Sequence, residues 1–129
     1  MRLLSLSISV ILLALVTLAP AAARAGAALS PTLDDIYGNI LQPMCSECHN
    51  DQTSLGWSAT SKQTAWNTLV NQSAEFCENT VRVIPGDPNN SALIQALEGT
   101  SPCLDQMPLG DLPLPQDTID VIRNWITAG

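Results

Sequence analysis

The chain has 129 residues, 46% of them hydrophobic, and a formal net charge of −7, with four cysteines and one histidine. A strongly acidic chain is repelled by the phosphates of nucleic acids and by anionic lipid headgroups, so neither is an expected partner. The length suits a single small domain with a modest hydrophobic core.

Residues 1–25 have the pattern of a secretory signal peptide. Arg2 gives a short basic start, and Leu3–Leu18 is apolar except for serine and threonine. The alanine-rich stretch that follows offers cleavage sites after Ala23 and after Ala25, of which we prefer the second. The alternative is an uncleaved membrane anchor, but the apolar run is short for a full span.

Cleavage would leave a mature domain of residues 26–129, exported to the periplasm or secreted. This domain keeps three of the five basic residues and all twelve acidic ones, which gives it a net charge of −9. It has no second apolar run of membrane length, so no membrane span is expected after cleavage. The charge would suit a protein partner with a basic docking patch, although a solvated acidic surface is the commoner origin of such charge.

Helical periodicity dominates the domain, and no run alternates with the period of a strand. The first predicted helix is 31–41, with Asp34 and Asp35 in the first turn, where the helix dipole favours negative charge. Gly38 in its middle costs roughly 1 kcal/mol of helix propensity and would let another helix cross closely. Pro43 is expected to end the helix.

Cys45, Cys48 and His49 form a C-x-x-C-H pattern, the attachment signature of c-type haem. Each sulfur would add to one haem vinyl group, and the histidine would bind the iron from the proximal side. A thioredoxin-like redox pair is an alternative that needs a βαβ context, which is missing. A zinc site is another, but it needs four ligands, and only Cys77 and Cys103 remain. The third alternative is that the C-x-x-C-H pattern occurs by chance.

The segment after this pattern is expected to be a loop, 50–60, followed by a second helix at about 62–72. Trp57 in the loop packs either on the haem edge or as an ordinary half-buried tryptophan. Thr60 or Ser61 can cap the helix. Its apolar side is expected to comprise Ala65, Trp66, Leu69 and Val70.

Two further helices are predicted nearer the C-terminus. The third follows a cap at Asn89 or Asn90 and stops at Gly99, and its expected buried face comprises Ala92, Leu93, Ala96 and Leu97. The last helix begins at Pro115, with Asp117 in its first turn. Its core-facing residues are expected to be Ile119, Ile122 and Ile126.

The irregular stretch 100–114 contains Met107, the strongest candidate for a second iron ligand. Because His49 is the only histidine, ligation by two histidines of one chain is excluded. Met44 lies beside the attachment turn and Met1 lies in the signal peptide, which leaves Met107 for the distal side. The alternative is that Met107 fills the core and the distal position is open or holds water.

Two cysteines, Cys77 and Cys103, remain after haem attachment. In an exported protein two such cysteines usually pair, so a disulfide is expected. It would fix the chain four residues before Met107. A redox-active or regulatory thiol pair is the alternative.

Several motifs resemble those of class I cytochromes c, in the same order along the chain. They are C-x-x-C-H at 45–49, V-x-P-G-D-P-x-N-S at 83–91, M-P-x-G at 107–110 and I-x-x-I-x-x-W-I-x-x-G at 119–129. The resemblance is closest to bacterial secreted monohaem modules, and it covers essentially the whole mature domain.

This resemblance implies an all-α fold of about four helices around one covalent haem c, with the first and last helices crossing. Carried onto this chain, it implies that Cys45 and Cys48 hold the haem, that His49 is the proximal ligand and that Met107 is the distal ligand. Gly38 would lie where the last helix crosses.

The function that the resemblance implies is transfer of single electrons between redox partner proteins, without catalysis by the domain itself, whether alone or as a module of a larger redox enzyme. A haem enzyme or a gas sensor with a labile distal site is the second possibility. A haem-free interaction domain with structural cysteines is the third.

Overall fold

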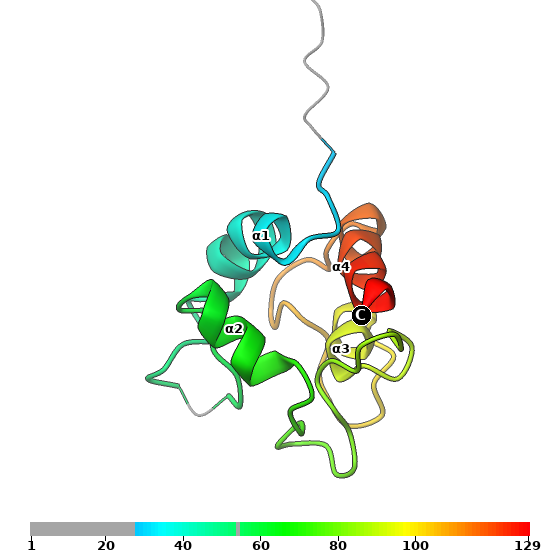
Figure 1. Cartoon of the computed structure of the whole chain (residues 1–129). Helices are drawn as coiled ribbons and strands as arrows, with labels where there is room; N and C mark the ends of the chain where they lie inside the picture. Colours follow the sequence, from blue (N-terminus) through cyan, green and yellow to red (C-terminus); the bar gives the residue numbers. More distant parts are fainter. Residues whose placement is uncertain (1–27, 54) are drawn as a thin grey trace, which may run out of the picture.

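The computed structural model describes residues 28–53 and 55–129, so the predicted signal peptide at 1–25 lies outside the described residues. Within these two ranges the chain forms an all-α domain of four helices without strands, as the periodicity predicted (Figure 1). The elements are α1 (Leu33–Ile36), its π-helical continuation η1 (Tyr37–Cys45), α2 (Lys62–Leu69), α3 (Ala92–Glu98) and α4 (Gln116–Ala128). Among the described residues, no helix has the length and apolar character needed to cross a membrane.

The first helix begins as predicted but runs further. The hydroxyl of Thr32 accepts a hydrogen bond from the backbone N–H of Asp35 and so caps α1. The expected end at Pro43 is wrong, because η1 continues through this proline to Cys45. A proline lacks the N–H of an i to i−4 bond and clashes with that carbonyl. Pro43 can donate neither this bond nor the i to i−5 bond of a π-helix, so η1 passes through it with one backbone donor fewer. Turns of π-helix often lie at functional sites.

The expected close crossing at Gly38 is also wrong. Gly38 is exposed, and a Cβ atom built on it meets nothing within 4 Å. The first and last helices do touch, since α1 contacts α4. Buried isoleucines on both sides, such as Ile36 and Ile122, belong to one hydrophobic cluster. In Figure 1, α1 and α2 lie on one side of the molecule, and α3 and α4 lie on the other.

The second helix is capped by Ser61, whose hydroxyl accepts from the backbone N–H of Thr64 at 3.0 Å. It ends at Leu69 rather than at 72. Val70 is extended and Asn71 has a φ of 56°, a left-handed conformation that asparagine tolerates and a helix does not. The predicted length was therefore wrong by less than one turn.

The third helix has a different cap from the one predicted. Ser91, not an asparagine, occupies the cap position, and its hydroxyl donates to the carbonyl of Asp87. Gly99 ends the helix with a φ of 66°, as expected. Leu93 is only partly buried. The buried residues are Ala92, Ile94, Ala96 and Leu97, because α3 packs on two clusters at once.

The last helix matches its prediction closely. It follows Pro115, has Asp117 in its first turn and ends at Gly129. Its three predicted isoleucines are buried in the core. This core draws on all four helices, and its buried members are Ile36, Ile40, Leu41, Ala59, Ala65, Leu69, Val83, Ile94, Leu97, Leu114, Ile119, Ile122 and Ile126.

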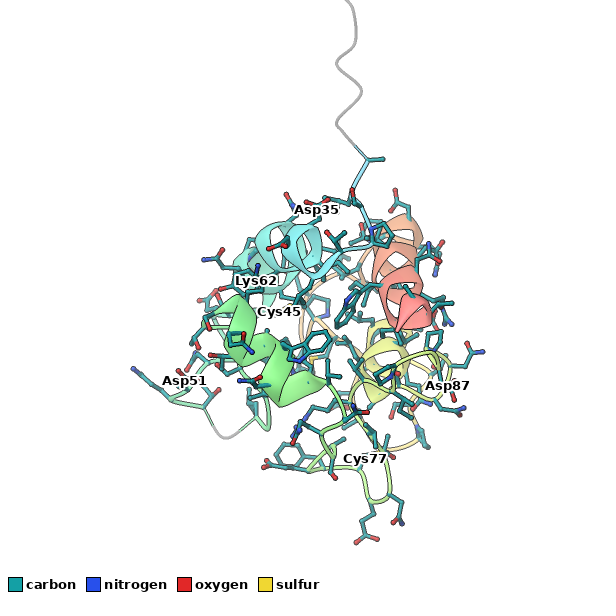
Figure 2. All side chains as sticks on the ribbon, viewed as in Figure 1. Asp35, Cys45, Asp51, Lys62, Cys77 and Asp87 are labelled. Carbon is teal, nitrogen blue, oxygen red and sulfur yellow. A yellow bond between two sulfur atoms is a disulfide. The ribbon has the colours of Figure 1, made fainter. Side chains whose placement is uncertain are left out.

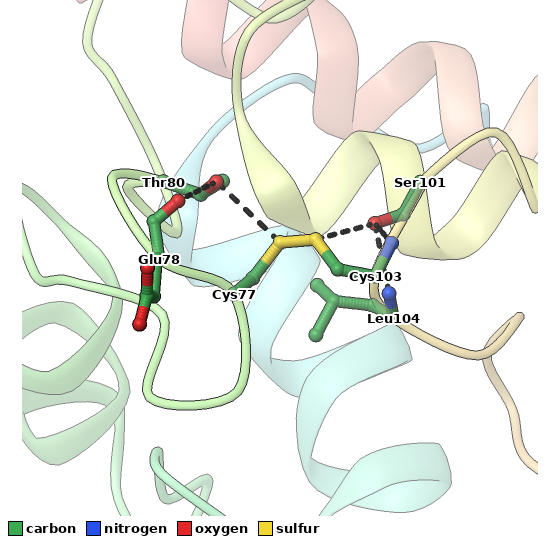
Figure 3. Close-up of a disulfide and its surroundings, with 6 residues drawn as sticks. All are labelled: Cys77, Glu78, Thr80, Ser101, Cys103 and Leu104. Carbon is green, nitrogen blue, oxygen red and sulfur yellow. Dashed lines mark hydrogen bonds between the residues drawn. A yellow bond between two sulfur atoms is a disulfide. The ribbon is translucent and has the colours of Figure 1, made fainter.

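A disulfide joins Cys77 to Cys103, with their Cα atoms 5.6 Å apart (Figure 3). Cys77 is only 4% exposed and lies in a second small cluster with Ala74 and Ala92. Leu104, the residue after Cys103, packs against this cluster. The bridge thus fixes the start of the long loop against the body of the domain.

Candidate functional site

The Cys45–His49 segment forms a single helical turn at the end of η1. The carbonyl of Cys45 accepts from the backbone N–H of Cys48 at 3.2 Å and from that of His49 at 2.7 Å. The side-chain amide of Asn50 donates to the carbonyl of Glu47 at 2.8 Å and closes the turn. This geometry brings the two cysteines and the histidine to one end of the helix.

The two cysteines of this turn are free thiols in different surroundings. Cys45 is half-buried and packs against the core, whereas Cys48 is exposed. Burial, and to a lesser extent the nearby Cys48, raise the pKa of the Cys45 thiol to about 11. Cys45 therefore stays protonated at neutral pH. Figure 2 labels Cys45 near the middle of the molecule.

One ring nitrogen of His49, Nδ1, is buried without a hydrogen-bond partner in the described part of the chain. Leaving a buried polar group unpaired costs about 1–3 kcal/mol, so such an atom in a folded protein calls for an explanation such as a missing ligand. The pKa of His49 is lowered, first by burial and then by the charge of Arg82, against the opposing effect of the Trp57 backbone. The ring is thus neutral at pH 7, the form that binds metals.

Trp57 stacks on the imidazole of His49, with ring centroids 4.3 Å apart and an interplanar angle of 22°. The backbone N–H of Ala59 donates to the carbonyl of His49 at 2.7 Å, which brings the loop back onto the Cys45–His49 turn. Trp57 is half-buried, as one of its two predicted roles required, but its stacking on His49 was not predicted. It depends on how a loop folds back, and no spacing in the sequence indicates it.

Met107 packs against the hydrophobic core of the domain. It is half-buried and packs against the core cluster that Cys45 and Trp57 also contact. Its backbone N–H donates to the carbonyl of Ala96 at 2.9 Å, which fixes the loop on α3. Met44, by contrast, is 47% exposed beside the attachment turn. The structure therefore brings Cys45 and Met107 to one core and keeps Met44 at the surface.

The alternatives to haem lose support in this structure. The zinc alternative required Cys77 and Cys103, which are bonded to each other. In residues 28–53 and 55–129, no group of three or more histidine, cysteine or acidic side chains could hold a metal ion. The same ranges contain no strand, so the βαβ context of a thioredoxin-like pair is also missing there.

An open depression of about 320 Å³ lies beside the Cys45–His49 turn. Its lining is mostly polar and comprises Asn50, Asp51, Thr53, Gly56, Trp57, Ser58, Thr68 and Glu75. A porphyrin is mostly apolar, so this depression does not suit one. The donors that fit haem are instead the free thiols of the turn, the unpartnered nitrogen of His49 and the thioether of Met107.

Comparison with known proteins adds no relative. No family model, no curated protein and no solved structure matches this chain. The reading of the site therefore depends on the residues themselves, above all on the C-x-x-C-H turn and the environment of its histidine.

Proposed function

We propose that the mature domain is a monohaem c-type cytochrome that carries single electrons between redox partners in the periplasm or outside the cell. The observation that carries this proposal is the buried, unpartnered Nδ1 of His49, in a turn that also presents two free thiols. Covalent haem would use both thiols and would give an imidazole nitrogen the bond it lacks.

Each residue of the site has a distinct part in this proposal. Cys45 and Cys48 bind the haem through thioethers, His49 is the proximal iron ligand and Met107 is the distal ligand. When bound, the haem supplies one-electron cycling between ferric and ferrous iron. An electron arrives from a donor and leaves to an acceptor, so no bond of a substrate is made or broken. The chain's own residues fix the ligands and exclude water.

A haem enzyme or ligand sensor is the second candidate. The observation in its favour is that Met107 lies on a loop without helix or strand, between α3 and α4. A ligand on such a loop is released more readily than one on a helix, because few backbone hydrogen bonds oppose local opening. A labile Met107 would leave the iron open to small molecules.

The Met107 loop also supports a proposal about the partner. Leu109 and Leu112 are 69% and 82% exposed, and the exposed carboxylate of Asp111 lies between them in the sequence. No lysine or arginine occurs between Arg82 and Arg123. A redox protein whose docking face has an apolar centre and a basic rim would complement this loop.

Spectra of the haem-loaded protein and of Met107→Ala test the proposed function. The wild type should be six-coordinate and low-spin when reduced and should not bind carbon monoxide, because both axial positions are filled. Met107→Ala should bind carbon monoxide and have a lower midpoint potential, since a thioether favours ferrous iron. Met44→Ala is the matched control and should leave both properties unchanged. If wild type and Met107→Ala bind carbon monoxide equally, the enzyme or sensor candidate is the better one.

A further inference from the structure

Arg82 is a half-buried cation whose position is fixed on three sides. Its backbone N–H donates to the carbonyl of Gln72 at 2.8 Å, and its own carbonyl accepts from Leu93 at 3.0 Å. Its Nη1 donates to the carbonyl of Thr68, near the end of α2, at 3.0 Å. Arginine side chains on protein surfaces are usually mobile, but this one is bound at both the backbone and the guanidinium.

The guanidinium of Arg82 lies against Gly56, in the loop that carries Trp57. A Cβ atom built on Gly56 would lie 2.7 Å from Nη2 of Arg82, and Gly56 has a φ of +86°. Only glycine allows both this approach and this backbone conformation. The carboxylate of Glu75 approaches the same point, 3.4 Å from that Cβ position. A continuous set of contacts thus runs from Arg82 through Gly56 and Trp57 to the ring of His49.

The other two basic residues of the mature domain are each held in an ion pair. Lys62 pairs with Asp34, and Arg123 pairs with Glu98. Arg82 instead meets the loop at Gly56, next to the Trp57 ring that stacks on His49. It is therefore the cation that the fold associates with the iron-binding end of the domain.

We propose that Arg82 is a positioning residue of the haem site, which supports Trp57 against His49 and raises the reduction potential of the iron. This inference rests on the proposed function. Reduction adds one electron and lowers the charge of the iron site by one unit, so a fixed cation nearby favours the reduced state. Glu75 acts on the same site with the opposite sign, and the pair sets the potential by its balance.

The test is the midpoint potential of the haem-loaded protein in a set of charge variants. Arg82→Gln should lower the potential, Glu75→Gln should raise it, and the double variant should lie between the two. Arg82→Lys keeps the charge and should stay close to the wild type even if the loop loosens. Arg123→Gln removes the same charge from the ion pair with Glu98 and is the matched control, with a smaller shift than Arg82→Gln.

A second measurement separates the structural part of the role. Amide hydrogen exchange at Gly56 and Trp57 should be faster in Arg82→Gln than in the wild type, and unchanged in Arg123→Gln. The inference is overturned if Arg82→Gln and Arg123→Gln shift the potential equally, or if Arg82→Gln raises it. A wild type that carries no haem would overturn the proposed function itself, a result distinct from an unchanged potential in the loaded variants.

Discussion

Removal of the Cys77–Cys103 bridge should destabilise the fold by an amount that follows from the loop it closes. The two cysteines are 26 positions apart in the sequence. On the chain-entropy account, a cross-link over this distance restricts the unfolded chain enough to stabilise the folded state by about 3.5 kcal/mol. The double variant Cys77→Ala/Cys103→Ser removes the bond, leaves no free thiol and puts the polar replacement at the exposed position.

Urea unfolding followed by circular dichroism measures the difference in free energy of unfolding between the oxidised wild type and the double variant. The wild type unfolded in the presence of a reductant is the control and should lose a similar amount. A difference below about 1 kcal/mol would refute the entropic reasoning. Free thiols at both positions in freshly isolated protein would refute the bond itself.

The same variant should loosen the Met107 loop before the helices. Cys103 lies four residues before Met107. Beyond the bridge, the loop is supported by the hydrogen bond from the Met107 N–H to the carbonyl of Ala96 and by the packing of Leu104. Amide exchange in residues 100–114 should therefore accelerate more than exchange in α4. Equal acceleration in both segments would mean that the bridge stabilises the whole fold and not this loop.

Three further predictions concern α4, α2 and the distal ligand. Ile122→Ala should lower the free energy of unfolding by about 2–5 kcal/mol in urea titrations, because Ile122 is fully buried in the core. Ser61→Ala removes the cap of α2 and should lower the free energy of unfolding by about 1 kcal/mol in the same assay. At alkaline pH, Lys62 or hydroxide should replace Met107, since the chain has no second histidine. Lys62 must leave its ion pair with Asp34 to do so, and Lys62→Gln should abolish any lysine-ligated spectrum.

The helices that the sequence predicted best are those whose signals are local. In α4 a proline precedes the first turn, an acidic residue follows it, and isoleucines recur with the helical period on one face. Gly99 ends α3 because a left-handed residue there favours glycine. These features depend on neighbouring residues alone, so they can be read without knowledge of the fold.

The predictions that were wrong depended on tertiary structure. The helix continues through Pro43 with π-helical geometry, and the sequence gives no sign of that continuation. Gly38 meets no neighbour, so a glycine within a helix was not evidence of a close crossing. In the candidate site, the motif identified Cys45, Cys48 and His49 as neighbours. The stacking of Trp57 on His49 and the approach of Arg82 to Gly56 require a loop that folds back over this turn, and local patterns do not reveal them.

Covalent haem is the central claim, and its most direct measurement is haem staining and the intact mass of the denatured mature protein, expressed with the machinery that attaches haem c. Haem should migrate with the denatured wild-type chain and add the mass of one haem. Cys45→Ala and Cys48→Ala should each weaken the attachment, and the double variant should lose it, because each thiol forms one thioether. A wild-type chain without haem, or a double variant that still carries haem after denaturation, would contradict the account.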